Sequence, residues 1–397
     1  MKLPQALHEL EYGHGSTYGQ EEQDALIEVL RANAPSCGPW VKKFEEEFAA
    51  FCGTQLGLAV TSGTTGLHLA MVAADVKPGD EVITTPISWI ATANAAALLG
   101  AKVVFADVNP RTLNLDPASV EKKITPRTKA ILPVHLYGQC ADMDALNELA
   151  RPRKIFVVED AAHAAGADYK GRKAGSLGDI GVFSFHQQKN MVTLGEGGML
   201  TTSNRDLYDR MLSYRSLCAR TYDPKGKYLA IDESARPMGK QYWYIDFDGV
   251  GFNYRMTDAQ AAVGSVQLRK LNAHNARRAE IARHYSDGLR GIQGLTLPFV
   301  SPENKHVFHA YVVLVESPLP KSKEDLMWEL LTKKRIKTWS HYMPIHLSTV
   351  YREMGHGPGE CPIAEKLLEN YFSLPIHPRM TDEVVQYVID AVRGCCD

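Results

Sequence analysis

The sequence predicts an α/β protein whose main sheet is largely parallel and is covered by helices on both faces. Between residues 56 and 204, short strand-type apolar runs alternate with helical stretches. The strands are uniformly apolar, which is typical of parallel strands buried on both faces. They are predicted at 56–61, 81–85, 103–108, 130–135, 155–159, 181–185 and 199–202, with helices at 67–73, 90–99 and 143–150. Ligands of such sheets bind at the carboxyl ends of the strands.

The chain length indicates about two domains. The 397 residues, 45% of them hydrophobic, can bury a large core. We expect an N-terminal segment and large domain over 1–262 and a smaller C-terminal α+β domain over 263–397, joined by a long helix from Asp258. The smaller domain should hold a strand at 310–315 and a helix at 323–333. Residues 221–248 are polar and aromatic-rich without a period, and we predict a long loop near a substrate site.

Composition argues against several classes of protein. A net charge of −2 and a pI near 6.7 provide no basic field for nucleic acid or anionic membranes. No apolar run is long enough to span a bilayer, and the N-terminus lacks the apolar core of a signal peptide. Seven scattered cysteines without a CxxC pair fit a reduced cytoplasm, and fourteen histidines show no HxxxH or HExxH spacing. We expect a cytoplasmic protein with no metal site and with neither nucleic acid nor membrane as a partner.

Lys189 is the most informative residue of the chain. It follows an apolar strand in residues 179–190 (DIGVFSFHQQKN), and a glycine cluster follows at 195–198 (GEGG). Upstream, one buried strand ends on Asp160, and Ser62-Gly63-Thr64 opens a helix. Pyridoxal 5'-phosphate (PLP) needs these three features: a lysine for its aldehyde, an acid for its pyridinium nitrogen and a helix start for its phosphate.

Each of these features also has a purely structural interpretation. A lysine is usually a surface residue. Asp160 could cap a helix over 161–165, and Ser62 with its neighbours could be a plain N-cap box. Trp89 could be core or could stack on an aromatic ring. The residues alone leave these alternatives open.

Over essentially its whole length, the chain resembles the DegT/DnrJ/EryC1/StrS family of PLP-dependent sugar aminotransferases, which have fold type I. The resemblance rests on many motifs in order. They occupy residues 38–41, 44–45, 61–64, 78–83, 124–131, 133–138, 159–163, 195–198, 251–256 and 373–378.

The resemblance implies a role for each site residue. Lys189 is implied as the lysine that binds PLP and as the general base, and Asp160 as the partner of the pyridinium nitrogen. Gly63, Thr64 and Ser184 match phosphate-binding positions, and Trp89 matches the stacking aromatic. Asn253 matches a residue that reaches the phosphate of the neighbouring subunit, which implies a homodimer. His163 stands where the family often has Gln, and packing on the ring or a contact to the phenolic oxygen are both open.

The implied activity is transfer of an amino group from glutamate or glutamine to a keto sugar, in ping-pong order through pyridoxamine phosphate, for amino-sugar biosynthesis such as that of lipopolysaccharide. The acceptor could be a nucleotide-linked keto sugar, an aminocyclitol precursor or a free keto sugar acid such as an oxidised octulosonate. A PLP-dependent sugar dehydratase would have histidine at the position of Lys189, and a non-catalytic regulator would have lost Lys189 or Asp160. Two stretches, 184–188 and 214–218, depart from the family pattern where sugar specificity would be set.

Overall fold

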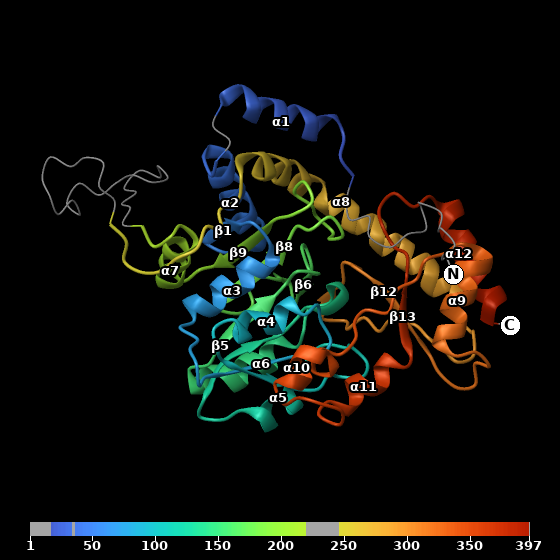
Figure 1. Ribbon diagram of the computed structural model, residues 1–397. Coiled ribbons are helices and arrows are strands. Elements are labelled where there is room, and N and C mark those ends of the chain that lie inside the picture. The colour runs from blue at the N-terminus through green and yellow to red at the C-terminus, as the bar shows by residue number, and fades with distance from the viewer. Residues whose placement is uncertain (1–16, 34–35, 220–245, 397) are drawn as a thin grey trace, which may run out of the picture.

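The protein is described by a computed structural model covering residues 17–33, 36–219 and 246–396 (Figure 1). Most of the predicted loop over 221–248 therefore lies outside the described residues, and only positions 246–248 are placed. The helices are α1 (Gln20–Ala32), α2 (Pro39–Cys52), α3 (Gly63–Ala73), α4 (Ala91–Ala97), α5 (Pro117–Lys123), α6 (Met143–Ala150), α7 (Arg205–Arg215), α8 (Asp258–Leu289), α9 (Lys323–Lys334), α10 (Thr349–Glu353), α11 (Pro362–Leu368) and α12 (Asp382–Cys396).

The main sheet has seven strands in the order β1-β9-β8-β5-β4-β2-β3. They are β1 (Leu56–Val60), β2 (Glu81–Thr84), β3 (Lys102–Phe105), β4 (Thr128–Leu132), β5 (Phe156–Asp160), β8 (Ile180–Ser184) and β9 (Gly198–Thr202). The neighbouring strands β8, β5, β4, β2 and β3 are parallel, whereas β9 runs antiparallel to both β1 and β8. The predicted, mainly parallel α/β sheet is confirmed. Each predicted strand is present, with ends that differ by a few residues.

Alternate side chains of each strand enter different cores, because successive strand residues point to opposite faces. In β8, Ile180 and Val182 pack on the face that carries α3, α4 and α7. Phe183 of the same strand packs on the other face, which carries α2, α6 and part of α8. Both faces are thus covered by helices, and ligands can reach the sheet only at the ends of its strands.

A third core lies around a small antiparallel sheet of β10 (Leu295–Thr296), β12 (Tyr311–Val315) and β13 (Tyr371–Leu374). The C-terminal half of α8, α9 and α12 cover this sheet with residues such as Tyr285, Leu326 and Val388. Figure 1 shows α8 as one long helix running from the main sheet toward β12, β13 and α12. A third sheet joins β11 (Asn304–Lys305), β6 (Asp168–Tyr169) and β7 (Arg172–Lys173).

The segment that carries α10 and α11 returns to the main sheet. Tyr351 and Leu367 belong to the core that also holds Phe105 of β3. The segment before it, at 339–342, reaches the carboxyl ends of the strands. The predicted domain boundary at 262/263 stays a prediction. Within the described ranges, no helix is long and apolar enough to cross a membrane.

Candidate active site

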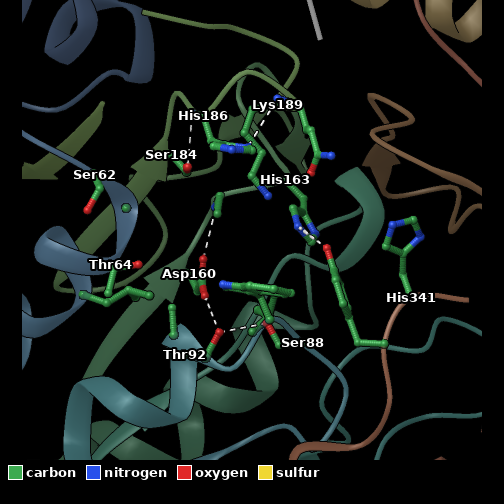
Figure 2. Close-up of a pocket in the computed structure, with 18 of the residues that line it drawn as sticks. Ser62, Thr64, Ser88, Thr92, Asp160, His163, Ser184, His186, Lys189 and His341 are labelled. Atoms are coloured by element: carbon green, nitrogen blue, oxygen red, sulfur yellow. Dashed lines mark hydrogen bonds between the residues drawn. The ribbon is translucent and has the colours of Figure 1, made fainter. Parts of the chain in front are cut away.

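A cavity of about 460 Å³ lies between the carboxyl ends of β5 and β8, the start of α3 and the segment at 339–342. Figure 2 shows the polar side chains that converge on it. Seven of the eight predicted site residues line this one cavity: Gly63, Thr64, Trp89, Asp160, His163, Ser184 and Lys189. Residues that are far apart in the sequence therefore meet at the place where a parallel sheet binds its ligands.

Asp160 is the last residue of β5, and its side chain is buried. Its Oδ2 atom accepts a hydrogen bond of 2.7 Å from the Thr92 hydroxyl, and its Oδ1 atom accepts one of 3.1 Å from the Ala162 backbone N–H. Burial raises the pKa of Asp160 above its ordinary value, and these two donors oppose that rise. Residues 161–166 form turns and no helix begins after Asp160, so the helix-cap interpretation does not hold.

The neighbouring acid, Glu159, points away from the cavity because strand side chains alternate. It is completely buried and contacts His135 at 2.9 Å. Its oxygens also accept backbone N–H groups from the turn before β8, namely those of Gly175, Leu177 and Gly178. Glu159 therefore anchors the turn, and Asp160 is the acid presented to the cavity.

Lys189 lies in the turn after β8. The turn is held against the segment before β9, because the backbone N–H groups of Phe185 and Gln187 donate hydrogen bonds to the carbonyls of Gly197 and Gly195, respectively. Burial lowers the pKa of Lys189 to about 8, and the Asp160 carboxylate partly opposes this shift. A large fraction of the Lys189 amine is therefore neutral near pH 8, as a nucleophile or a base requires.

The start of α3 provides an anion-binding corner. Ser62 caps the helix and accepts the Thr65 N–H at 3.2 Å. The Gly63 and Thr64 N–H groups have no assigned acceptor in the described part of the chain, as expected in the first turn of a helix. A Cβ atom at Gly63 would lie 2.8 Å from the Ser184 Cβ. The missing side chain thus lets the helix start approach Ser184, and the corner fits a phosphate.

His163 is buried in the cavity wall. Its Nδ1 atom accepts the Tyr137 N–H at 3.4 Å, and its Nε2 atom lies 3.3 Å from the Tyr342 hydroxyl. The His163 ring also stacks on His309, with 4.2 Å between ring centroids. Burial holds the pKa of His163 well below its ordinary value, so the ring is neutral. Because Nδ1 accepts, the neutral ring carries its proton on Nε2 and donates it to Tyr342.

Trp89 lies at the rim of the cavity, where 62% of its surface is exposed. The interpretation of Trp89 as a core residue is therefore wrong. Its ring meets the Tyr342 ring edge to face at 6.1 Å. The two rings form an aromatic edge to the cavity.

The eighth predicted residue, Asn253, is not brought to this cavity by its own chain. It is exposed, and it pairs with Ser216 through an isolated backbone bridge. A role for Asn253 in this site would require a second chain.

Several residues that line the cavity were not predicted from the sequence: Ser88, Thr92, Trp339, His341 and Tyr342. Thr92 lies in the first turn of α4 and Ser88 lies in the bend before that helix, so no helical pattern indicates that the two hydroxyls meet. The other three come from the C-terminal part of the chain, and no local pattern indicates that their segment reaches the main sheet. His186, Gln188 and Glu196 also line the cavity. His186 and Gln188 belong to the stretch at 184–188 whose sequence differs from the usual family pattern.

The model of the DegT/DnrJ/EryC1/StrS aminotransferase family matches residues 16–393. The chain belongs to this family. It is 39% identical to GDP-perosamine synthase of Caulobacter vibrioides, with 94% of each chain covered. It is 37% identical to dTDP-3-amino-3,4,6-trideoxy-alpha-D-glucose transaminase of Streptomyces venezuelae, with 94% of this chain and 91% of the relative covered.

Among solved structures, the PLP form of Spr1654 from Streptococcus pneumoniae superposes with a TM-score of 0.86 at 26% identity, covering 97% of this chain and 98% of the other. The fold is that of the PLP-dependent aminotransferases of fold type I, as the sequence predicted. The family consists of PLP-dependent enzymes, and this family member is a sugar aminotransferase.

Proposed function

We propose that this enzyme uses PLP to transfer the amino group of glutamate or glutamine to the keto group of a nucleotide-linked sugar. The observation that carries the proposal is the placement of Lys189 and Asp160 in one cavity of about 460 Å³ that also contains an anion-binding helix start. The names of two relatives, a GDP-linked and a dTDP-linked amino-sugar enzyme, support the nucleotide-linked acceptor.

The residues present fit PLP. The absence of a side chain at Gly63 lets the start of α3 lie against Ser184, and this corner would hold the phosphate, with Gly63, Thr64 and Ser184 as donors. Asp160 would hold the proton on the pyridine nitrogen, and Trp89 offers an aromatic face to the ring. When bound, PLP supplies an aldehyde that takes up amino groups and a ring that delocalises negative charge from the substrate carbon.

The protein's own contribution is to bind, orient and move protons. A large fraction of Lys189 Nζ is neutral near pH 8. In the donor half-reaction it would remove the α proton of the amino acid, and in the acceptor half-reaction it would give a proton to the carbon that receives the amino group. The Asp160 carboxylate stays ionised to hold the ring-nitrogen proton, helped by the hydrogen bonds from Thr92 and Ala162. Donor and acceptor would use the same cavity in turn, which corresponds to a ping-pong order.

The outer wall suits a sugar ring. Trp339 and Tyr342 provide aromatic surface, and His186, Gln188 and Glu196 provide polar groups around it. Aromatic faces pack on the apolar faces of a sugar, while polar side chains bond its hydroxyls. The Nε2 proton of His163 orients the Tyr342 hydroxyl, which we propose contacts the acceptor.

We further propose that the active unit is a cytoplasmic homodimer in which Asn253 of one subunit completes the phosphate site of the other. The exposure of Asn253 and its absence from its own chain's cavity support this proposal. All seven cysteines are buried free thiols, which agrees with a reducing compartment.

The test is to incubate the PLP-loaded protein with glutamate or glutamine and a panel of acceptors, and to detect the amino product by mass. The panel should hold nucleotide-linked 4-keto and 3-keto sugars, a keto inositol and an oxidised octulosonate. Amination of a nucleotide-linked sugar, lost in Lys189→Ala, is the expected result. Amination of the keto inositol or the sugar acid alone, or dehydration without amination, would contradict the proposal.

A further inference from the structure

Both oxygens of the Asp160 carboxylate accept hydrogen bonds from groups within the protein. Oδ1 accepts the Ala162 N–H, and Oδ2 accepts the Thr92 hydroxyl at 2.7 Å (Figure 2). The Thr92 oxygen in turn lies 2.8 Å from the Ser88 hydroxyl. An ionised carboxylate only accepts, so the Thr92 hydrogen goes to Asp160 and the Ser88 hydrogen goes to Thr92. The three side chains form a directed chain that ends on Asp160.

The chain lies in the interior of the protein. Ser88 and Thr92 are 4% and 1% exposed, so water does not replace either hydroxyl. A hydrogen bond that reaches a charged group in such surroundings is stronger than one in water. The short segment from Ser88 to Thr92 also carries Trp89, so it presents both the aromatic face and the donor to Asp160.

Several groups bias the ionisation of Asp160. Burial raises its pKa most strongly, and the Thr92 hydrogen bond is the largest opposing influence, ahead of the Ala162 N–H. Lys189, after β8, lowers the pKa of Asp160 from within the cavity, where His163 also lies. His135, after β4, lowers it from the opposite side, where it contacts Glu159. Removal of the Thr92 hydroxyl would therefore shift Asp160 toward the neutral acid.

We infer that Thr92 is a positioning residue that keeps the Asp160 carboxylate ionised and in one orientation for the ring nitrogen of PLP, and that Ser88 orients the Thr92 hydroxyl. This inference rests on the proposed function, because it assigns Asp160 to the cofactor. Thr92 does not touch the reacting atoms and acts through Asp160.

Thr92→Val, which removes the hydroxyl and keeps the shape, tests the inference. The matched control is Thr84→Val, since Thr84 is also 1% exposed and its hydroxyl donates to the Leu132 carbonyl at 2.7 Å, away from the cavity. PLP affinity is measured by absorbance titration across pH, and the glutamate half-reaction is followed in single turnover.

We expect Thr92→Val to weaken PLP binding and slow the half-reaction by about 10- to 100-fold, the size of a hydrogen bond to a charged group. Both PLP affinity and the rate of the half-reaction fall at acid pH, and in Thr92→Val this fall (the acid limb) should begin at a higher pH. The reason is that Asp160 with a raised pKa becomes protonated at a higher pH. Thr92→Ser should restore most of both losses. Thr84→Val should leave affinity and acid limb unchanged.

An unchanged acid limb with PLP affinity within twofold of wild type, or equal effects of Thr92→Val and Thr84→Val, would overturn the inference. If Thr92→Val folds poorly, Ser88→Ala tests the same chain, with a smaller shift in the same direction expected and no shift overturning it. Wild-type protein that takes up no PLP would overturn the proposed function together with this inference. Wild-type protein that binds PLP beside an unaffected Thr92 variant overturns the inference alone.

Discussion

At the scale of single residues, the cavity combines two ionisable groups, Lys189 and Asp160, whose surroundings bring their pKa values closer to neutral pH. Burial lowers the pKa of Lys189 to about 8 and raises that of Asp160 above its ordinary value. Each group favours the charged form of the other. Perturbed groups of this kind concentrate at functional sites, and here each shift suits one proposed task.

Lys189→Ala should abolish transamination and the visible absorbance that the lysine gives to bound PLP, because Lys189 is the only lysine that lines the cavity in the described part of the chain. The fold should remain, as judged by circular dichroism. In the wild type, the rate of covalent PLP uptake should rise with pH and level off above about pH 8, because the neutral amine is the reactive form.

Borohydride reduction followed by peptide mapping provides the check. The phosphopyridoxyl group should be found on Lys189. A suitable control is Lys170→Ala, since Lys170 is an exposed surface lysine paired with Asp144. Cofactor trapped at another lysine in the Lys189 variant would contradict the assignment.

Asp160→Asn should still bind PLP but should lower the rate of the glutamate half-reaction by at least about 100-fold, because an amide does not hold the ring-nitrogen proton. Rapid-mixing absorbance measurements of the PLP-loaded variant would follow this rate. A rate near that of the wild type would show that Asp160 only orders the turn after β5.

At the scale of secondary-structure elements, the start of α3 is shaped by the close approach of its first residue to β8. Gly63→Ala would place a Cβ 2.8 Å from the Ser184 Cβ and force apart the two sides of the corner that we assign to the phosphate. Alanine is the better helix former, so any loss must come from this contact. We expect PLP affinity to fall about 10- to 100-fold, the equivalent of a moderate overpacking cost.

Gly394→Ala serves as the control for this measurement. Gly394 lies in α12 and a Cβ there meets no atom within 4 Å. PLP titration of both variants compares steric obstruction with the general effect of adding a methyl group to a helix. Equal affinities in the two variants would argue against a phosphate at the start of α3.

At the scale of the whole molecule, Asn253 decides between a site built from one chain and a site shared by two. Its neighbour Phe252 packs beside His68 in the middle of α3, with ring centroids 5.0 Å apart, while Asn253 itself is exposed. Several exposed apolar side chains surround this region, including Leu217, Phe247 and Val250. Such a surface suits an interface between two copies.

Mixing inactive Lys189→Ala with a severely impaired Asn253→Ala should therefore restore part of the activity. In a mixed dimer, one shared site carries both defects and the other carries neither. Activity is assayed after subunit exchange has been confirmed with differently tagged chains. If Asn253 serves only its own chain, each site keeps one defect and no activity returns.

The sequence by itself determined the α/β class and indicated Lys189, Asp160 and the helix start at Gly63, whereas Ser184 and His163 were implied by the family resemblance. Strands that are buried on both faces must be apolar throughout, and the residues at their ends are exposed to ligand, so both signals are local. The alternation of Glu159 and Asp160 along β5 likewise follows from strand geometry, although the face that is turned to the cavity could not be known from the pair alone.

Only the tertiary structure decided the rest of the site. The antiparallel pairing of β9 with β8, the hydrogen bond from Thr92 to Asp160 and the contact of Tyr342 with His163 join residues 14 to 179 positions apart in sequence. Their contacts depend on how β2, β5, β8 and the 339–342 segment pack around one cavity. The hydrophobic periodicity of the sequence does not predict such packing. A threonine or a tyrosine looks the same in the local sequence whether its side chain faces solvent or a buried carboxylate.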